Sequence, residues 1–498
     1  LVLLKNANNL LPLDKSQIKR IAVCGPNADE ASFALTHYGP VAVEVTTVLE
    51  GIKQQVKEGT KVTYTKGCDL VDTNWPESEI ISYPLTAEEK TEIQKAVDNV
   101  KESDVAVVVL GGGIRTCGEN KSRTSLDLPG HQQQLLEAIV ATGKPVVLVL
   151  INGRPLSINW ADKFVPAILE AWYPGSQGGT AIAEALFGDY NPGGKLTVTF
   201  PKTVGQIPFN FPAKPASQVD GGQTPGMKGN QSRINGPLYP FGYGLSYTTF
   251  EYSNLQLSFP VITDKEPVTV TCKIKNTGTR SGDEVVQLYT RDVVSSVTTY
   301  EKNLRGFERV HLEPGETKEV SFQLLPRDFQ LLNKDNHWVV EPGMFQIMIG
   351  ASSEDIRLKK GLEIRAYGQA SANEIIESDP RDFISASKNK SHIIHVVDGD
   401  YSTTWKGEKG EYISFELAEN AKVDRINVAW KNAEAGARYE IQISSGGGQF
   451  LPVQRGEVTP NQEETIRFNK TGGSDLRILI TNGSAEIAEI KLPELRKE

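Results

Sequence analysis

Several common signals are missing from this sequence of 498 residues. No apolar run approaches the ~20 residues that a membrane-spanning helix needs, so we expect no membrane span. No block of lysine and arginine stands out, and the formal net charge is -9. A mildly acidic chain has no electrostatic attraction to nucleic acid or anionic lipid, so we exclude both as partners.

Cysteine is scarce and scattered. The residues Cys24, Cys68, Cys117 and Cys272 form neither a closely spaced disulfide framework nor a CxxC metal pattern, so cysteine usage does not fix the compartment. The first residues, LVLLKN, have no initiator methionine and no charged start, which distinguishes them from a signal peptide. We expect a mature, processed or truncated product.

The first part of the chain alternates apolar runs with helical patterns. Val105–Leu110 and Pro145–Ile151 are near-continuous runs of Val, Ile and Leu, which are typical of strands buried on both faces of a parallel sheet. Ala87–Glu102 and Gly130–Thr142 carry apolar residues at helical spacing. This alternation predicts a doubly wound α/β sandwich with a mostly parallel sheet, ending in a loop or linker over residues 205–250.

The rest of the chain has only strand signals. Val268–Ile274 alternates with period two, and Asn276-Thr277-Gly278 is a turn signal after it, which predicts a β-sandwich. Further on, Glu411–Leu417 and Tyr439–Ser444 indicate another sandwich or a jelly roll. A single core rarely organises more than ~250–300 residues. We therefore expect three domains, with boundaries at 1–250, 251–366 and 367–498.

The strongest local signal is the polar loop that follows the strand at Val105–Leu110. Ligands of open α/β sheets bind outside the carboxyl ends of the strands, so the loop is well placed for binding. Glu119 is the one acidic residue between Gly111 and Leu126. It is a candidate proton donor, or else a solvated surface charge with Arg123 as its ion-pair partner. The loop glycines fit neither GxGxxG nor GxxxxGK[ST], which argues against a phosphate site.

The same loop carries a family resemblance. Gly118-Glu119 followed by Ser122-Arg123-Thr124-Ser125-Leu126-Asp127-Leu128-Pro129-Gly130 resembles the acid/base loop of glycoside hydrolase family 3. Further blocks agree with that family in the same order: Leu3-Leu4-Lys5-Asn6, Asn152-Gly153-Arg154-Pro155, Ala171-Trp172-Tyr173-Pro174-Gly175, Gly188-Asp189-Tyr190-Asn191-Pro192-Gly193-Gly194 and Pro240-Phe241-Gly242-Tyr243-Gly244-Leu245. The second domain looks like the family's fibronectin-III-like domain, through Arg305-Gly306-Phe307 among others.

The resemblance implies a retaining, exo-acting β-glycosidase that removes terminal β-D-glucosyl residues from oligosaccharides or aryl β-glycosides. It implies that Glu119 is the general acid/base, and we assign Arg123 to substrate binding. A retaining enzyme also needs a nucleophile ~5–5.5 Å from the acid. In this family the nucleophile is an Asp in a Ser-Asp-Trp segment of a preceding (β/α)8 barrel, and that segment is absent from this sequence. We therefore predict that the chain alone is inactive and that the missing barrel is its partner domain.

The third domain resembles a discoidin-like jelly roll through Val397-Asp398-Gly399-Asp400-Tyr401-Ser402-Thr403-Thr404-Trp405. That resemblance implies carbohydrate binding and a structural calcium ion, for which Asp398 and Asp400 offer hard oxygen ligands. A tight turn capped by the same carboxylates is the alternative. The hydrolytic chemistry itself requires no metal or organic cofactor.

Other functions stay open at this point. A β-xylosidase of the same family is the nearest alternative, because the pocket that separates the two sugars would lie mainly on the barrel. A non-catalytic carbohydrate-binding scaffold and a nucleotide-binding α/β protein are the others. From the expected function and the appended β domains we predict a secreted or periplasmic protein, and we leave a homodimer open.

Overall fold

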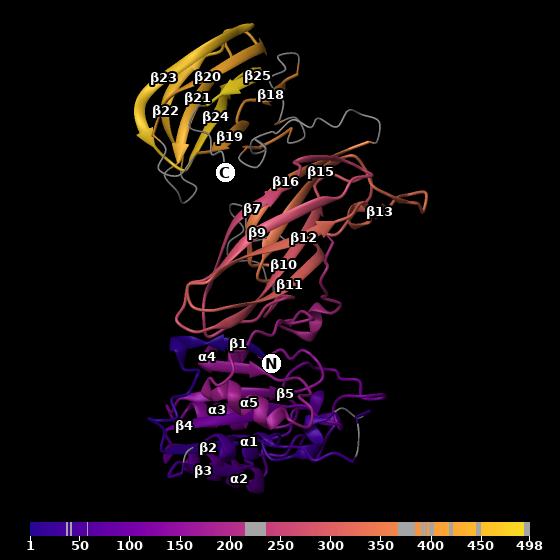
Figure 1. Cartoon of the computed structure of the whole chain (residues 1–498), viewed down its shortest axis with the longest axis vertical. Coiled ribbons are helices and arrows are strands. Elements are labelled where there is room, and N and C mark those ends of the chain that lie inside the picture. Colours follow the sequence, from indigo (N-terminus) through magenta and orange to yellow (C-terminus); the bar gives the residue numbers. More distant parts are fainter. Residues whose placement is uncertain are drawn as a thin grey trace. The chain divides into compact units, whose positions relative to one another are not determined.

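The computed structural model describes the chain except for residues 36–37, 40–41, 57, 215–235, 367–383, 390–392, 394–395, 398–402, 418–421, 445–449 and 493–498. Its residues divide into two compact units, one of 1–258 with 265–359 and the other of 259–264 with 360–498. The predicted order of an α/β region followed by two β regions is confirmed (Figure 1).

The α/β region is built on one six-stranded sheet with the order β1-β6-β5-β4-β2-β3. Its strands are β1 (Val2–Asn6), β2 (Arg20–Cys24), β3 (Lys61–Thr65), β4 (Val105–Gly111), β5 (Val146–Ile151) and β6 (Ala167–Glu170). The strands from β2 to β6 are parallel to their neighbours, as predicted, whereas β1 was not predicted and pairs antiparallel with β6.

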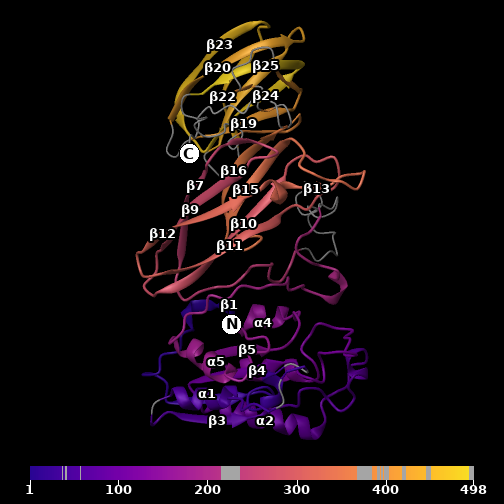
Figure 2. The same ribbon diagram turned by 45° about the vertical axis from the view of Figure 1, so that its right-hand side comes forward.

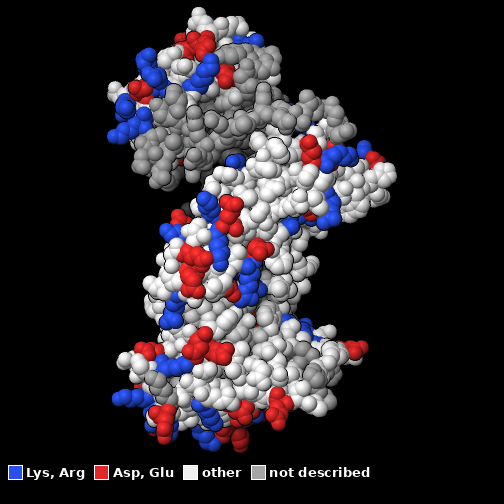
Figure 3. All heavy atoms as spheres, viewed as in Figure 1, with Lys and Arg blue, Asp and Glu red and all other residues white. Residues whose placement is uncertain are grey.

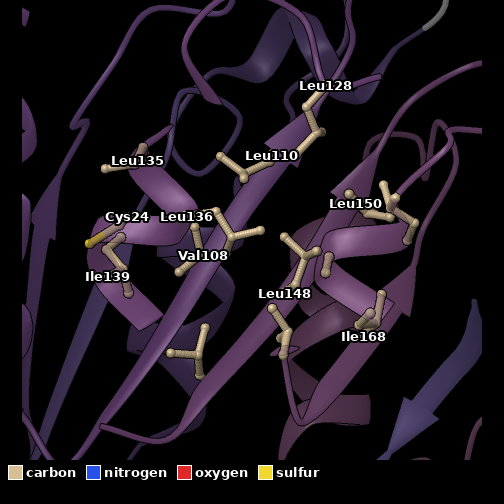
Figure 4. Close-up of a cluster of buried hydrophobic side chains, with 14 of the residues drawn as sticks. Cys24, Val108, Leu110, Leu128, Leu135, Leu136, Ile139, Leu148, Leu150 and Ile168 are labelled. Carbon is tan, nitrogen blue, oxygen red and sulfur yellow. The ribbon is translucent and has the colours of Figure 1, made fainter. Parts of the chain in front are cut away.

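Helices cover both faces of this sheet. On one face, α2 (Ala87–Lys101), α3 (Gln132–Val140) and α4 (Asn159–Phe164) share an apolar cluster with the sheet. On the other face, α1 (Val48–Gln55) and α5 (Gly178–Phe187) share a second cluster. Figure 4 shows the first cluster, in which side chains of α3 meet those of β4 and β5.

The sequence of β4 explains why this sheet is buried on both sides. Val108 and Leu110 face the first cluster, while Val107 and Val109 face the second, and all four side chains are fully buried. Burying a side chain of this size contributes ~1.5–3 kcal/mol relative to exposure. A run of apolar residues without alternation is therefore what a two-sided core requires.

Two glycines allow α1 and α5 to pack closely on the second face. A Cβ atom added to Gly51 would lie 2.1 Å from the carbonyl oxygen of Gly179. One added to Gly179 would lie 2.0 Å from the carbonyl oxygen of Thr47. Both distances are far below van der Waals contact, so any side chain at either position would push the two helices apart.

The fibronectin-III-like region consists of two layers of mostly antiparallel strands. One sheet has the order β11-β10-β15-β16-β8 and the other β12-β9-β7. The strands are β7 (Phe250–Leu257), β8 (Val261–Thr263), β9 (Val268–Asn276), β10 (Gly282–Asp292), β11 (Asn303–Leu312), β12 (Thr317–Leu324), β15 (Gly343–Gly350) and β16 (Ile356–Arg365), and β13 (Leu331–Leu332) with β14 (Trp338–Val339) forms a small hairpin. The pairing of β8 with β16 is parallel.

Polar contacts join this sandwich to the α/β region. Lys195 Nζ lies 3.0 Å from Glu284 Oε1, and both side chains are largely buried. Gln287 Nε2 donates a hydrogen bond of 3.0 Å to the carbonyl of Gly242. Removing one partner of a buried ion pair lowers the free energy of unfolding by several kcal/mol. These contacts therefore hold the α/β region and the sandwich together as one unit.

The third region is also a two-layer β structure, with sheets β17-β19-β24-β21-β22 and β18-β25-β20-β23. Figure 2 shows both sheets from a second side. Their strands are β17 (Ile384–Ala386), β18 (Trp405–Glu408), β19 (Tyr412–Glu416), β20 (Lys422–Ala433), β21 (Arg438–Ser444), β22 (Phe450–Glu457), β23 (Gln462–Gly472), β24 (Asp475–Asn482) and β25 (Ser484–Lys491). Trp405 and Trp430 lie in the core between the sheets.

Two features concern the surroundings of the protein: the distribution of charge on its surface, and the length and hydropathy of its helices. On the face drawn in Figure 3, acidic and basic side chains of the described residues are intermixed over all three regions. Of the helices in the described part of the chain, none is both long and apolar enough to cross a membrane.

Candidate active site

The carboxyl ends of the parallel strands form one edge of the α/β sheet. β3 lies beyond β2 on one side, while β5 and β6 lie beyond β4 on the other, so the direction of chain progress reverses between β2 and β4. Open α/β sheets bind ligands in the crevice at such a reversal. The segments that follow β2 and β4 therefore flank the expected ligand position.

Glu119 lies in the segment after β4, and its side chain is exposed. Its backbone N–H donates a hydrogen bond of 2.8 Å to the hydroxyl of Tyr38, which lies in the segment after β2. The neighbours Gly118 and Asn120 have positive φ angles of 133° and 58°, which turn the chain sharply on both sides of Glu119. The carboxylate makes no hydrogen bond or ion pair to the residues that the structure describes, so it is available to a ligand.

The base of this loop is held by a single guanidinium. Arg154 Nη2 donates to the carbonyl of Thr116 at 3.1 Å and to that of Lys121 at 3.0 Å. The buried Thr116 accepts a hydrogen bond of 3.0 Å at its hydroxyl from the N–H of Gly113. The two ends of the turn that contains Glu119 are thus fixed to the end of β5, which positions an otherwise solvent-exposed carboxyl group.

Arg123 is buried and forms an ion pair with Glu79. Its guanidinium also lies 5.1 Å from the ring centroid of Trp75 and donates to the carbonyl of Asp127 at 3.0 Å. Burial lowers the pKa of Arg123 to about 10, so the side chain stays charged at neutral pH. The partner in the structure is thus Glu79 rather than Glu119, while a role of Arg123 in substrate binding stays a prediction.

Glu79 also holds the loop of Glu119 in place through its second carboxylate oxygen. Glu79 Oε2 accepts hydrogen bonds from the N–H of Thr124 at 2.9 Å and from its hydroxyl at 3.1 Å. With the bond to Arg123, one buried carboxylate anchors two consecutive residues of the loop. A carboxylate satisfied in this way is a structural element, since burying it without partners would cost several kcal/mol.

A second carboxyl group lies buried at the end of β6. Glu170 has no exposed surface, and burial raises the pKa of its carboxyl to about 8, opposed by a hydrogen bond of 2.9 Å from the N–H of Trp172. Trp172 itself has a φ of 55°, which is unusual for a residue with a side chain. Glu170 therefore stabilises the turn at Trp172 by accepting its backbone N–H, while burial favours the protonated form of the carboxyl.

Sequence reasoning missed Tyr38, Glu79 and Glu170 as parts of this site. Tyr38 follows no motif, and Glu79 lies 44 residues before its partner Arg123. For Glu170 a signal existed, because a carboxylate at the end of an apolar strand faces the crevice of an α/β sheet. Arg154 was part of a block that resembles the family, but nothing in the sequence linked it to the loop of Glu119.

The predicted calcium ligands Asp398 and Asp400 lie outside the residues that the structure describes. Within the described residues, no group of three or more His, Cys, Asp or Glu side chains is placed to hold a metal ion.

Family comparisons bear directly on this site. Residues 1–247 match the glycosyl hydrolase family 3 C-terminal domain, and the match includes the loop of Glu119. This region is a family 3 C-terminal domain. Residues 284–353 match the fibronectin type III-like domain, and residues 382–491 match the F5/8 type C domain, the discoidin-like type. The family resemblance of all three predicted regions is confirmed.

Relatives of the family 3 domain are β-glycosidases by name. A β-xylosidase of Formosa agariphila is 46% identical over 72% of this chain and 48% of its own length. A periplasmic β-glucosidase of Salmonella typhimurium is 40% identical, again over 72% of this chain and 48% of its own length. The chain thus spans about half the length of these curated relatives.

Solved structures agree. A β-glucosidase of Erythrobacter marinus has a TM-score of 0.64 at 38% identity, covering 73% of this chain and 49% of its own. A β-glucosidase of Listeria innocua in complex with isofagomine has a TM-score of 0.64 at 34% identity, covering 73% of this chain and 48% of its own.

Proposed function

We propose that this chain is the general acid/base portion of a retaining, exo-acting β-glycosidase, with Glu119 as the acid/base. The observation that carries the proposal is the placement of Glu119 at the crevice of a family 3 domain. Its carboxylate is exposed and unbonded within the described structure, and the turn around it is fixed by Arg154 and Tyr38.

The reaction needs a second carboxylate as nucleophile. In the first step the nucleophile forms a bond to the anomeric carbon, the glycosidic C–O bond breaks, and Glu119 gives its proton to the leaving oxygen. In the second step the Glu119 carboxylate takes a proton from water, which displaces the nucleophile and releases the sugar. We assign the nucleophile to an Asp of a (β/α)8 barrel that works together with this chain, in line with the half-length coverage of its relatives.

The substrate class we propose is an oligosaccharide or aryl glycoside with a terminal β-linked D-glucosyl residue. A terminal β-D-xylosyl residue is the second candidate, favoured by the 46% identical β-xylosidase. Rates on the two nitrophenyl glycosides, measured side by side with a barrel-bearing enzyme, distinguish them. By likeness to the periplasmic β-glucosidase we also propose a secreted or periplasmic location.

Substituting Glu119 by Gln tests the proposal in a protein in which a family 3 barrel precedes Leu1. Gln cannot transfer the proton, so kcat/KM toward a glycoside with a poor leaving group should fall by about 10²–10⁴-fold. A dinitrophenyl glycoside needs little protonation, so its glycosylation step should be much less affected. Steady-state kinetics on both substrates measure the contrast.

The matched control is Glu308→Gln, which removes an exposed carboxylate of β11 and should change neither substrate. Equal losses on both substrates would indicate a misfolded variant, and no loss on either would refute Glu119 as the acid/base. Saccharide binding without any turnover by the barrel-bearing protein would favour a non-catalytic scaffold instead.

A further inference from the structure

The sheet that contains β24 in the third region has two very different faces. Its inner face carries Ile413, Ile441 and Ile478, which are fully buried in the core. On the outer face, Ser414 of β19, Arg477 of β24 and Gln442 of β21 stand side by side in register. A polar outer face is normal for an antiparallel sheet, but on this sheet some of the polar side chains are buried.

Two of these outward polar groups are buried. Ser414 is only 7% exposed and Gln442 8% exposed, although neither belongs to the apolar core. Tyr412 and Phe450 contribute aromatic rings to the same face, and each is half-buried. Buried polar groups beside aromatic rings are typical of ligand sites, which combine apolar walls with a few directed polar atoms.

Arg477 occupies the centre of this face between the two rings. Its guanidinium carbon lies 3.9 Å from the ring centroid of Phe450 and 4.9 Å from that of Tyr412. Its Nε donates a hydrogen bond of 2.5 Å to Gln442 Oε1. The rings and the amide fix the plane of the guanidinium, so its orientation does not have to be ordered when a ligand binds.

Arg477 nevertheless has no carboxylate in direct contact among the described residues, although the charge of Glu440 on β21 acts on it from further away. No carboxylate of the described residues forms an ion pair with it, and its two terminal nitrogens make no hydrogen bond to those residues. Burial lowers the pKa of Arg477, which reflects the cost of holding this charge partly away from water. A fixed, half-buried guanidinium with free N–H groups is a receptor for a planar anion, because arginine and carboxylate form two parallel hydrogen bonds.

A hollow lies next to Arg477 on the same sheet. Its volume is about 460 Å³, and its walls include Arg438, Glu440, Arg455 and Glu457. Arg455 and Glu440 form an ion pair of 3.4 Å there. Glu440 and Gln442 are two residues apart on β21, so the hollow and Arg477 are ~7 Å apart along the strand. Paired charges of this kind donate to and accept from hydroxyl groups while leaving little net charge.

We propose that this face binds an acidic saccharide, with a uronic acid carboxylate on Arg477 and a neighbouring sugar unit in the hollow. The anion follows from the unpaired guanidinium, and the saccharide rests on the proposed glycosidase function. The mixed charges of the hollow suit hydroxyl groups rather than a second anion. The site would hold the enzyme on a polymer that contains uronic acids, apart from the catalytic crevice.

Isothermal titration calorimetry of the whole chain with trigalacturonate, its methyl ester and a sulfated trisaccharide tests this assignment. Trigalacturonate should bind at least 10-fold more tightly than the methyl ester, which has the same hydroxyl groups but no charge. Arg477→Gln should weaken trigalacturonate binding by about 10-fold or more, as expected for a lost charge-assisted hydrogen bond. Arg477→Lys keeps the charge without the two-pronged geometry and should restore only part of the affinity.

Arg467→Gln is the matched control, since Arg467 is an exposed arginine on β23 of the other sheet and should leave the affinity unchanged. Thermal unfolding of each variant separates loss of the site from loss of the fold, and Arg477→Lys serves if Arg477→Gln does not fold. Equal affinity for acid and ester, tighter binding of the sulfated sugar, no binding at all, or an unaffected Arg477→Gln would each overturn the proposal. Because none of these titrations measures turnover, they stand apart from the Glu119→Gln test of the catalytic function.

Discussion

The buried ion pair between Arg123 and Glu79 gives a sharp test of how the acid/base loop is held. The side chains are only 4% and 6% exposed, so replacing Arg123 by Met leaves a carboxylate buried without its cation. Losing one partner of a buried pair costs ~3–5 kcal/mol. Glu79 keeps two hydrogen bonds from Thr124, which offset part of the loss. We therefore expect the free energy of unfolding to fall by ~3 kcal/mol.

Calorimetry of the α/β transition measures this change, and a second substitution isolates its cause. Arg123→Met combined with Glu79→Gln removes the unpaired charge but keeps the acceptor for Thr124, so the double variant should be ~1–2 kcal/mol more stable than Arg123→Met alone. Lys95→Met is the control, because Lys95 and Glu92 form an exposed pair with side chains 61% and 48% exposed. Its loss should cost less than ~1 kcal/mol.

One outcome would refute this reasoning. If Arg123→Met costs no more than Lys95→Met, the buried pair does not stabilise the loop. If that variant also raises KM in a barrel-bearing enzyme at unchanged stability, Arg123 binds substrate, as the sequence predicted. A large loss of stability with KM unchanged supports a structural role.

Two further predictions concern groups that line the same edge of the sheet. The pKa of Glu170 is raised in the folded state, so its contribution to stability is fully present below its unfolded value near ~4.5 and is lost as pH rises toward about 8. Glu170→Gln should remove this decline in the free energy of unfolding, which is on the order of a few kcal/mol. If the free energy of unfolding has the same slope against pH in the variant as in the unchanged protein, the assignment is contradicted. Tyr38→Phe removes the acceptor for the Glu119 N–H and should lower kcat/KM for poor leaving groups by about 2- to 10-fold, the equivalent of one hydrogen bond. Unchanged kinetics of Tyr38→Phe would show that this contact does not position Glu119.

Much of the α/β architecture could be predicted because its strands differ in kind from surface strands. β4 and β5 are apolar at every position, and only a sheet covered on both faces tolerates that. By contrast, α5 was missed because it begins with two glycines and has only two polar residues, Thr180 and Glu184, so its amphipathic period is weak. Gly179 is there because α1 approaches too closely for a side chain, and no local pattern can reveal such an approach.

The sequence predicts where the site lies in the fold, but not which residues contact one another there. The apolar run before Gly111 put Glu119 on a loop at the carboxyl edge, where the structure has it. Its supports could not be read from sequence, because Tyr38 and Arg154 come from the ends of other strands. Ion pairs such as that of Arg123 depend on long-range packing, and the charges in the sequence do not determine which carboxylate is the partner.

The Arg154 clamp also limits how this loop can change over evolutionary time. One nitrogen bonds the carbonyls of both Thr116 and Lys121, so the stretch between them has a fixed span. An inserted residue inside that stretch would break one bond or displace Glu119 from the crevice. Beyond Lys121 the loop meets a second anchor, because the buried Glu79 bonds both Arg123 and Thr124. The clamp and the Glu79 anchor therefore fix the length of the stretch from Thr116 to Thr124, which contains the proton donor.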